Sequence, residues 1–324
     1  MSRDEKNKLW KRITAALLSF LACMACGTAA VFADEKIDTE ATASLTVFFG
    51  KDGEGFSNVE FRIYRVAGGS ETGGYTLSGV FQDYPVVLEG LDSSGWRALA
   101  QTLDAYAARD GLPPLQTKRT GRDGQAEFTG LAAGLYLIRG DRYVAGGKTY
   151  TPEPMLVTLP VLTQENEWNY NVEVSCKFES EDSSSDRVQR SVLKIWEDDG
   201  NEKNRPKEIS VQLLENGTVV DTVTLHAENN WEHTWESLTA DSKWQVAEAE
   251  TPAGYTVSVA QEGTVFVMTN TYSAGPSSPP PSTPPTAPQT GMLWWPVPLL
   301  VCGGLLLLAT GCLIRSRRGE QDDE

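Results

Sequence analysis

The chain has 324 residues, a formal net charge of −16 and a hydrophobic fraction of 40%, which suits two or three domains rather than one. The acidic balance argues against a nucleic-acid partner, because binding phosphates needs a basic patch. Only two histidines are present, His226 and His233, so we expect neither a histidine-based metal site nor a Ser/His/Asp triad, and no cofactor. Outside residues 1–33 and 292–324 the chain has a single cysteine, Cys176, which excludes a disulfide scaffold and a zinc ribbon.

Residues 1–33 have the layout of a secretory signal peptide. Basic residues precede an apolar run at 13–26, and small residues follow up to Ala33, after which we place the cleavage site. The apolar run is short for a membrane span. The alternative is a lipoprotein with its lipid on Cys23, since a leucine and an alanine precede that cysteine.

A first domain of mostly β structure is predicted at 34–180. Short apolar runs bounded by turn residues indicate its strands. These strands are 45–49, 60–66, 125–128, 135–139, 155–159 and 170–176.

One helix is predicted as an insertion in this domain. Apolar side chains recur at the helical spacing of three to four residues: Trp96, Leu99, Leu103 and Tyr106. Ser94 can cap the start of the helix, and Gly111 and Pro113 can end it.

A second domain is predicted at 187–272, after a polar, serine-rich linker at 179–186. Its predicted strands are 191–197, 209–214, 218–225, 231–235, 244–248, 255–259 and 265–272. Asn216 and Gly217 stand between two of these strands and indicate a tight hairpin. Seven short strands without helical periodicity are typical of a β-sandwich.

The remaining residues predict a stalk and a membrane anchor. Residues 273–291 are rich in proline, serine and threonine, which favours an extended spacer. Residues 292–324 begin with an uncharged run long enough to span a bilayer, followed at once by arginines and a short tail. The predicted fold class is therefore all-β. It comprises two tandem immunoglobulin-like β-sandwiches, the first with a helical insertion, and a C-terminal transmembrane helix.

The order of these C-terminal features resembles a cell-wall sorting signal. The motif Ala287-Pro288-Gln289-Thr290-Gly291 before the apolar span is similar to the LPXTG motif of Gram-positive bacteria, with alanine in place of leucine. The resemblance implies that a sortase cleaves between Thr290 and Gly291. It would then pass the Thr290 acyl group to an amine of peptidoglycan or of another subunit. A plain single-pass membrane anchor is the alternative.

Three polar residues of the second domain share a strand face with apolar side chains. Lys194 lies on the same strand face as Val192 and Trp196. Glu248 shares its face with Trp244 and Val246. Asn270 shares its face with Phe266 and Met268. Burying an unpaired ammonium or carboxylate costs several kcal/mol. Edge positions and a snorkelling lysine are the alternative interpretation.

The second domain resembles the Cna B-type repeat of Gram-positive surface proteins. The similar positions, in order, are 193–198, 205–206, 211–217, Trp231, 246–248, 252–255 and 269–272. The resemblance implies an intramolecular isopeptide bond between Lys194 and Asn270, formed with the help of Glu248. An apolar pocket lowers the pKa of a lysine and raises that of a glutamate, which would make such a reaction possible.

The first domain resembles the N-terminal domain of LPXTG-anchored major pilins. The similar segments are 59–67, 130–137 and 150–152. Its end at 168–177 has the spacing of the pilin motif, which implies that Lys177 is the amine used to join subunits, although Ser175 and Cys176 replace Tyr-Pro. Lys177 is opposite in strand parity to Cys176 and should face solvent. An ordinary surface lysine is the alternative. The first strand has no lysine, so no isopeptide bond is expected in this domain.

Together these features predict a secreted structural protein rather than an enzyme. We expect a sortase-processed pilin subunit of the cell wall, made as a single-pass membrane precursor. Its partners would be sortase, peptidoglycan and other pilin subunits, the last two joined through Thr290. A monomeric wall-anchored adhesin that binds a host matrix protein is the alternative function.

Overall fold

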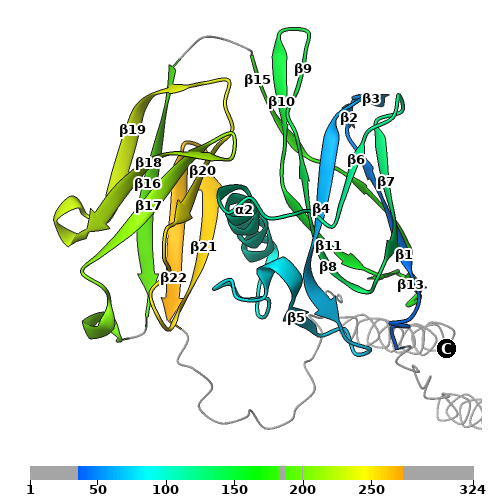
Figure 1. The fold of residues 1–324 in the computed structure, drawn as a ribbon, viewed down its shortest axis with the longest axis horizontal. Coiled ribbons are helices and arrows are strands. Elements are labelled where there is room, and N and C mark those ends of the chain that lie inside the picture. The colour runs from blue at the N-terminus through cyan, green and yellow to red at the C-terminus, as the bar shows by residue number, and fades with distance from the viewer. Residues whose placement is uncertain (1–35, 183–186, 199, 273–324) are drawn as a thin grey trace, which may run out of the picture. The chain divides into compact units, whose positions relative to one another are not determined.

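The computed structural model describes residues 36–182, 187–198 and 200–272 (Figure 1). The predicted signal peptide, the stalk with Thr290 and Gly291, and the transmembrane helix lie outside these residues. Within them, no helix is both long enough and apolar enough to cross a membrane.

The first domain contains most of the strands. These are β1 (Ala43–Phe48), β2 (Gly50–Lys51), β3 (Glu54–Gly55), β4 (Glu60–Gly69), β5 (Tyr75–Leu77), β6 (Gln116–Arg119), β7 (Gln125–Leu131), β8 (Gly134–Gly140), β9 (Tyr143–Ala145), β10 (Lys148–Pro152), β11 (Met155–Leu159), β12 (Val161–Leu162), β13 (Trp168–Asn169), β14 (Asn171–Ser175) and β15 (Phe178–Asp182).

Two sheets form the body of this domain. One has the order β14-β1-β7 and the other β11-β8-β4-β5, with β6 also paired to β4. Along β1 every second residue is buried, as expected for a strand with one face on the core. Leu45 and Val47 of β1 thus share a core with Phe61 and Ile63 of β4.

The helix α2 (Ser93–Arg109) lies between the two domains (Figure 1). Its predicted apolar face is confirmed, because Leu99, Leu103 and Tyr106 are buried. The predicted cap is wrong: the N-cap is Asp92, whose carboxylate accepts a hydrogen bond from the Gly95 amide at 2.8 Å. Ser94 instead donates its hydroxyl hydrogen to the same carboxylate. A carboxylate is also favoured at this end of a helix by the macrodipole.

The predicted linker at 179–186 is wrong over its first half. Residues 178–182 form β15, which pairs antiparallel with β10. Its side chains are mostly exposed because it is the edge of a small β15-β10-β9 sheet, and an edge strand can be polar on both faces. The strand is held by its backbone ladder and by Phe178 packing against the first core.

The second domain contains the predicted seven strands. These are β16 (Arg187–Glu197), β17 (Glu208–Glu215), β18 (Thr218–His226), β19 (Glu232–Thr239), β20 (Trp244–Glu248), β21 (Tyr255–Glu262) and β22 (Val265–Tyr272). The described residues also contain short 3₁₀ turns. These are η1 (Gly79–Phe81) in the first domain, and η2 (Glu202–Asn204) and η3 (Ala227–Asn229) in the second.

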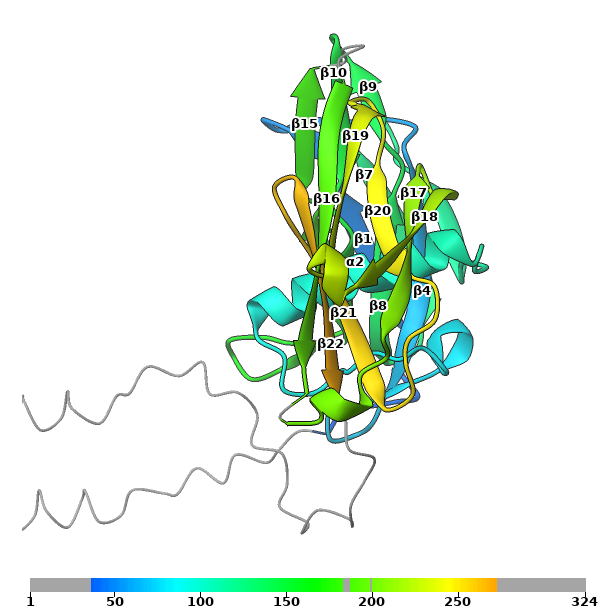
Figure 2. The same cartoon turned by 90° about the vertical axis from the view of Figure 1, so that its left-hand side faces the viewer.

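These strands form two sheets, β19-β16-β22-β21 and β18-β17-β20. The first strand, β16, is paired in parallel with the last, β22, in the middle of its sheet (Figure 2). The predicted hairpin is confirmed: Asn216 and Gly217 both have positive φ, of 52° and 86°, and join β17 to β18. A two-residue turn of this kind matches the twist of the strands it connects.

The strands and sheets of the two domains confirm the prediction of a mostly β chain with immunoglobulin-like domains.

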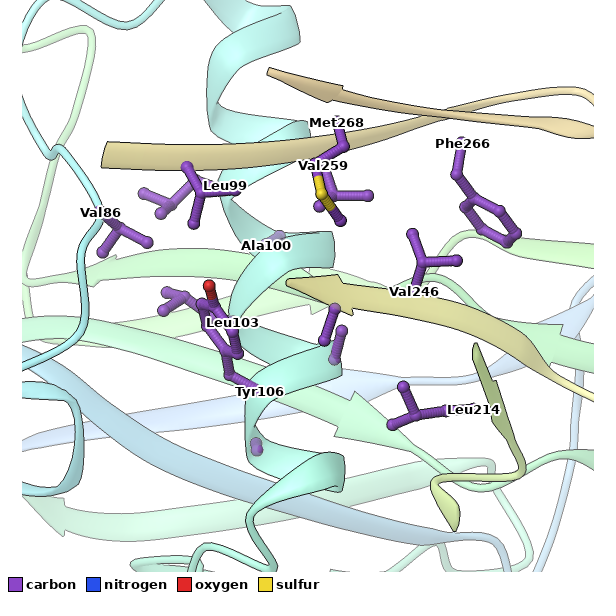
Figure 3. Close-up of a cluster of buried hydrophobic side chains, with 14 of the residues drawn as sticks. Val86, Leu99, Ala100, Leu103, Tyr106, Leu214, Val246, Val259, Phe266 and Met268 are labelled. Atoms are coloured by element: carbon purple, nitrogen blue, oxygen red, sulfur yellow. The ribbon is translucent and has the colours of Figure 1, made fainter. Parts of the chain in front are cut away.

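Helix α2 packs on the second domain at strand β21. Side chains of the helix share one apolar cluster with Val246, Val259 and Met268 (Figure 3). The amides on the outer edge of β21 are paired as well. The Val259 amide donates to the Thr102 hydroxyl at 2.8 Å, and the Gln261 amide to the Gln101 side chain at 2.9 Å. The first domain therefore covers a sheet edge of the second.

A buried charge also joins the domains. Asp104 of α2 is fully buried and accepts hydrogen bonds from Lys243 at 2.5 Å and from Gln245 at 2.9 Å. It also forms an ion pair with Arg139 of β8 at 2.8 Å. These two cations hold the pKa of Asp104 below its usual value against the opposing effect of burial. The carboxylate thus remains charged and fixes the position of the helix.

Candidate functional site

Lys194 lies on β16 with its side chain in the core, where only 4% of its surface is exposed. The amine donates a hydrogen bond to the Ile195 carbonyl at 3.0 Å and lies 4.2 Å from the centre of the Trp196 ring. Strand alternation places Lys194 on the face that also carries Val192 and Trp196. Trp196 is enclosed by Trp231 and Tyr255, so the amine lies against an aromatic wall.

Asn270 lies on the neighbouring strand β22. Lys194 is paired with Met268, so Asn270 is the next residue on the same face of the sheet. Its side chain is fully buried. The amide nitrogen donates to both carboxylate oxygens of Glu248, at 3.0 and 3.1 Å, and the amide oxygen has no hydrogen-bond partner.

Glu248 approaches from the opposite sheet. It is the last residue of β20, is paired with Val211 of β17, and has 1% of its surface exposed. The two sheets of the second domain thus bring Lys194, Glu248 and Asn270 together in the core, as strand parity suggested. The alternative interpretation of edge or snorkelling positions is wrong for these residues.

Burial shifts the pKa values of the two ionisable groups toward each other. Desolvation lowers the pKa of Lys194 to about 7, although the nearby Glu248 and Asp198 act in the opposite direction. Arg205 adds to the lowering. Desolvation likewise raises the pKa of Glu248, partly offset by Lys194. Both shifts favour the uncharged forms of the two groups, which are a neutral amine and a protonated carboxyl.

This arrangement contains the groups that an amide exchange would need. A neutral lysine is a nucleophile, and the carboxamide of Asn270 is an electrophile on the neighbouring strand, two residues along from the partner of Lys194 and on the same face of the sheet. In the structure the amide nitrogen of Asn270 faces Glu248. With the carboxamide turned over, a protonated Glu248 would donate to the amide oxygen and stabilise the charge that develops there. Attack would join the lysine nitrogen to the amide carbon, and the original amide nitrogen would leave as ammonia.

Sequence reasoning missed residues that surround this site. Asp198 is nearly buried and ion-paired with Arg205, and it also accepts a hydrogen bond from the Tyr255 hydroxyl at 3.3 Å. Thr251 forms a hydrogen bond with Glu248. The sequence signal that could have found three of them is the family resemblance, because its segments contain Asp198, Arg205 and Tyr255. Nothing in the sequence marked Thr251.

Lys177 belongs to the first domain and is exposed. It follows β14, and its backbone carbonyl accepts a hydrogen bond from the Glu153 amide at 2.8 Å. Its side chain lines a surface hollow with Trp96, Arg97 and Met155. Its neighbour Cys176 is buried as a free thiol, and burial raises the pKa of that thiol to about 12. Lys177 is thus an accessible amine, while Cys176 is an unreactive core residue.

Strand β1 has no lysine, so the first domain lacks the counterpart of Lys194 in its first strand. In the described residues, no group of three or more His, Cys, Asp or Glu side chains could hold a metal ion. Thr290 and Gly291 lie outside the described residues.

Two family models match the chain. Residues 33–179 match the Gram-positive pilin subunit D1, N-terminal domain, and residues 190–271 match the Cna protein B-type domain. A collagen adhesin of Staphylococcus aureus is 28% identical over 120 residues, which cover 35% of this chain and 10% of the adhesin. The chain therefore spans about a tenth of that relative's length.

Solved structures of low sequence identity also match. The full-length major pilin SpaD of Corynebacterium diphtheriae is 16% identical, with a TM-score of 0.28 over 73% of this chain and 66% of that chain. A single B repeat unit of the collagen-binding surface protein of Staphylococcus aureus is 17% identical, with a TM-score of 0.26 over 72% of this chain and 98% of that chain.

Proposed function

The chain combines a Gram-positive pilin subunit D1 domain with a Cna protein B-type domain, and from this premise we propose that it is a sortase-processed pilin subunit of the cell wall. We propose further that its second domain crosslinks itself through Lys194 and Asn270. The observation that carries the second proposal is the buried contact of Asn270 with Glu248, beside a buried lysine whose pKa is lowered to about 7.

The proposed reaction balances without a cofactor. The Lys194 nitrogen attacks the side-chain carbonyl carbon of Asn270, and the resulting intermediate loses the asparagine nitrogen. Glu248 gives a proton to the departing nitrogen and takes one from the lysine nitrogen, so it ends as it began. One amide replaces another and one ammonia is released. The event happens once per chain and is therefore not enzymatic turnover.

The rate of crosslinking should pass through a maximum as pH is varied. The reactive state holds one proton on the Lys194–Glu248 pair, located on the glutamate. At low pH both groups are protonated and the amine cannot attack. At high pH neither is protonated and Glu248 cannot act as an acid. The full chain, refolded from a denatured and uncrosslinked form in a series of buffers, should show this profile by intact mass. A rate that rises steadily with pH would argue against Glu248 as the acid.

Wall attachment should depend on 287–291. We propose that sortase joins the Thr290 carboxyl to an amine after cleavage before Gly291, as the layout of the sorting motif, apolar run and arginines indicates. Deleting 287–291 should move the protein from the covalent wall fraction to the membrane or the medium. Fractionation after digestion of the wall measures this. A matched deletion of 279–283 in the proline-rich stalk should leave attachment intact. Unchanged attachment without 287–291 would refute the role of sortase.

A single-copy surface adhesin is the second candidate function. It is favoured by the similarity to a collagen adhesin, which covers 35% of this chain. The two functions differ in their products. An immunoblot of boiled, detergent-treated wall extracts should show a ladder of covalent multimers for a pilin. A single band in a strain with its sortases present would favour the adhesin.

A further inference from the structure

The backbone of Glu248 is held by the first domain. Arg109, in the last turn of α2, donates a hydrogen bond to the Glu248 carbonyl oxygen at 2.6 Å. The guanidinium is fixed in turn by two further hydrogen bonds to the Asp110 carboxylate, both at 2.7 Å. Asp110 also accepts a hydrogen bond from the Tyr84 hydroxyl at 2.6 Å. The orientation of Arg109 is therefore set by residues of the first domain.

The carboxyl group of Glu248 is linked to the same helix through Thr251. Thr251 forms a hydrogen bond with the Glu248 carboxyl group. The hydroxyl of Tyr106, one turn before Arg109 on α2, lies 3.4 Å from the Thr251 hydroxyl oxygen. Tyr106 is buried at the contact between α2 and the second domain (Figure 3). Its ring is covered by the Arg109 guanidinium at 4.6 Å and packs against Tyr84 at 5.0 Å.

We propose that helix α2 of the first domain completes the crosslinking site of the second, with Arg109 and Tyr106 as positioning residues for Glu248. The inference rests on the proposed Lys194–Asn270 crosslink. It goes beyond that crosslink because the family model for the crosslinking domain covers residues 190–271 and leaves α2 outside. The bond would thus form efficiently only when the two domains are docked.

The position of Glu248 explains why it needs this support. It is the last residue of β20, and the chain turns away immediately after it. Beyond its hydrogen bond with Thr251, the carboxyl group is held inside the second domain by the Asn270 amide that is to react. On the other side, Arg109 of α2 holds the backbone carbonyl of Glu248, and α2 packs against β20. Proton transfer requires the acid to be within hydrogen-bond reach in the correct orientation, so a loosely held Glu248 would react slowly.

Conservative substitutions in the full chain test this inference. The chain is refolded from a denatured, uncrosslinked form, and the loss of one ammonia is followed by intact mass. Tyr106→Phe and Arg109→Met should each slow the loss about tenfold, the effect of one lost hydrogen bond to a charged or reacting group. Thr251→Val should slow it similarly, and Thr251→Ser should restore it. The matched control is Tyr136→Phe, which removes a hydroxyl that donates to Ala132 inside the first domain and should have no effect.

The pH profile separates positioning from a general loss of structure. Loss of the Thr251 hydrogen bond should raise the pKa of Glu248, so the pH optimum of Thr251→Val should move to higher pH while its folded signal by circular dichroism is unchanged. Wild-type rates and an unmoved optimum in folded Tyr106→Phe and Thr251→Val would overturn the inference. If the wild-type chain loses no ammonia at all, the crosslink itself is refuted, and the positioning role with it.

Discussion

Replacing Lys194 with methionine should abolish the release of ammonia and lower the melting temperature by more than about 15 °C. Methionine fills the same apolar space but has no amine, so the loss of stability reports the absent bond. A covalent link that closes a loop of this size stabilises a domain by about 4 kcal/mol when its effect is taken by analogy with a disulfide. For a domain of this length each kcal/mol corresponds to several degrees. Intact-mass measurement and calorimetry provide the two readouts.

Two further variants make this test specific. Glu248→Gln keeps the shape of the side chain and removes the acid, so the folded protein should retain its full, uncrosslinked mass. Lys207→Met removes an exposed lysine of the same domain and should leave the crosslink and the melting temperature unchanged. Folded wild-type protein with the full mass of its sequence would show that the Lys194–Asn270 bond does not form.

Replacing Lys177 with arginine should collapse a ladder of covalent multimers to monomer. Arginine keeps the positive charge, but its guanidinium stays protonated and cannot attack an acyl group. The exposure of Lys177 beside a surface hollow supports its use as an acceptor for the Thr290 carboxyl of another subunit. Head-to-tail joining of this kind does not close on itself and would give a filament. An immunoblot of wall extracts measures the outcome.

A matched exposed lysine in the first domain controls for this result. Lys118→Arg changes a lysine of β6 in the same way and should leave the ladder intact. Lys177→Arg should also leave the mass loss due to the internal crosslink unaffected, because Lys194 lies in the other domain. A ladder that persists in Lys177→Arg would show that subunits are joined through a different amine.

The placement of the three core residues was predictable because a strand has a period of two. Lys194, Glu248 and Asn270 each alternate in register with large apolar side chains, so their burial follows from the same pattern that defines the strands. The helix was predictable for a similar reason, through Leu99 and Leu103. Their side chains mark one face at a spacing that no strand would produce.

Other features depended on contacts that a local pattern does not carry. Strand β15 is polar because it is a sheet edge, so its composition matched that of a linker. Asp92 and Ser94 are both good capping residues, and only the geometry of the turn decides between them. Tyr106 and Arg109 are ordinary helical residues in sequence, and their contact with Glu248 depends on the docking of two domains. Contacts between residues so far apart in the sequence are set by tertiary packing.

The parallel pairing of β16 with β22 determines how this domain would respond to force. The chain enters along β16 and leaves along β22, so tension on the two ends shears the strands past each other along their full ladder. In the proposed crosslinked form, load would pass from Lys194 directly to Asn270. Residues 195–269 would then bear no tension, although each could otherwise add about 3.4 Å of length when pulled straight. A filament built from such subunits would transmit a pull on its tip to the cell surface almost without lengthening.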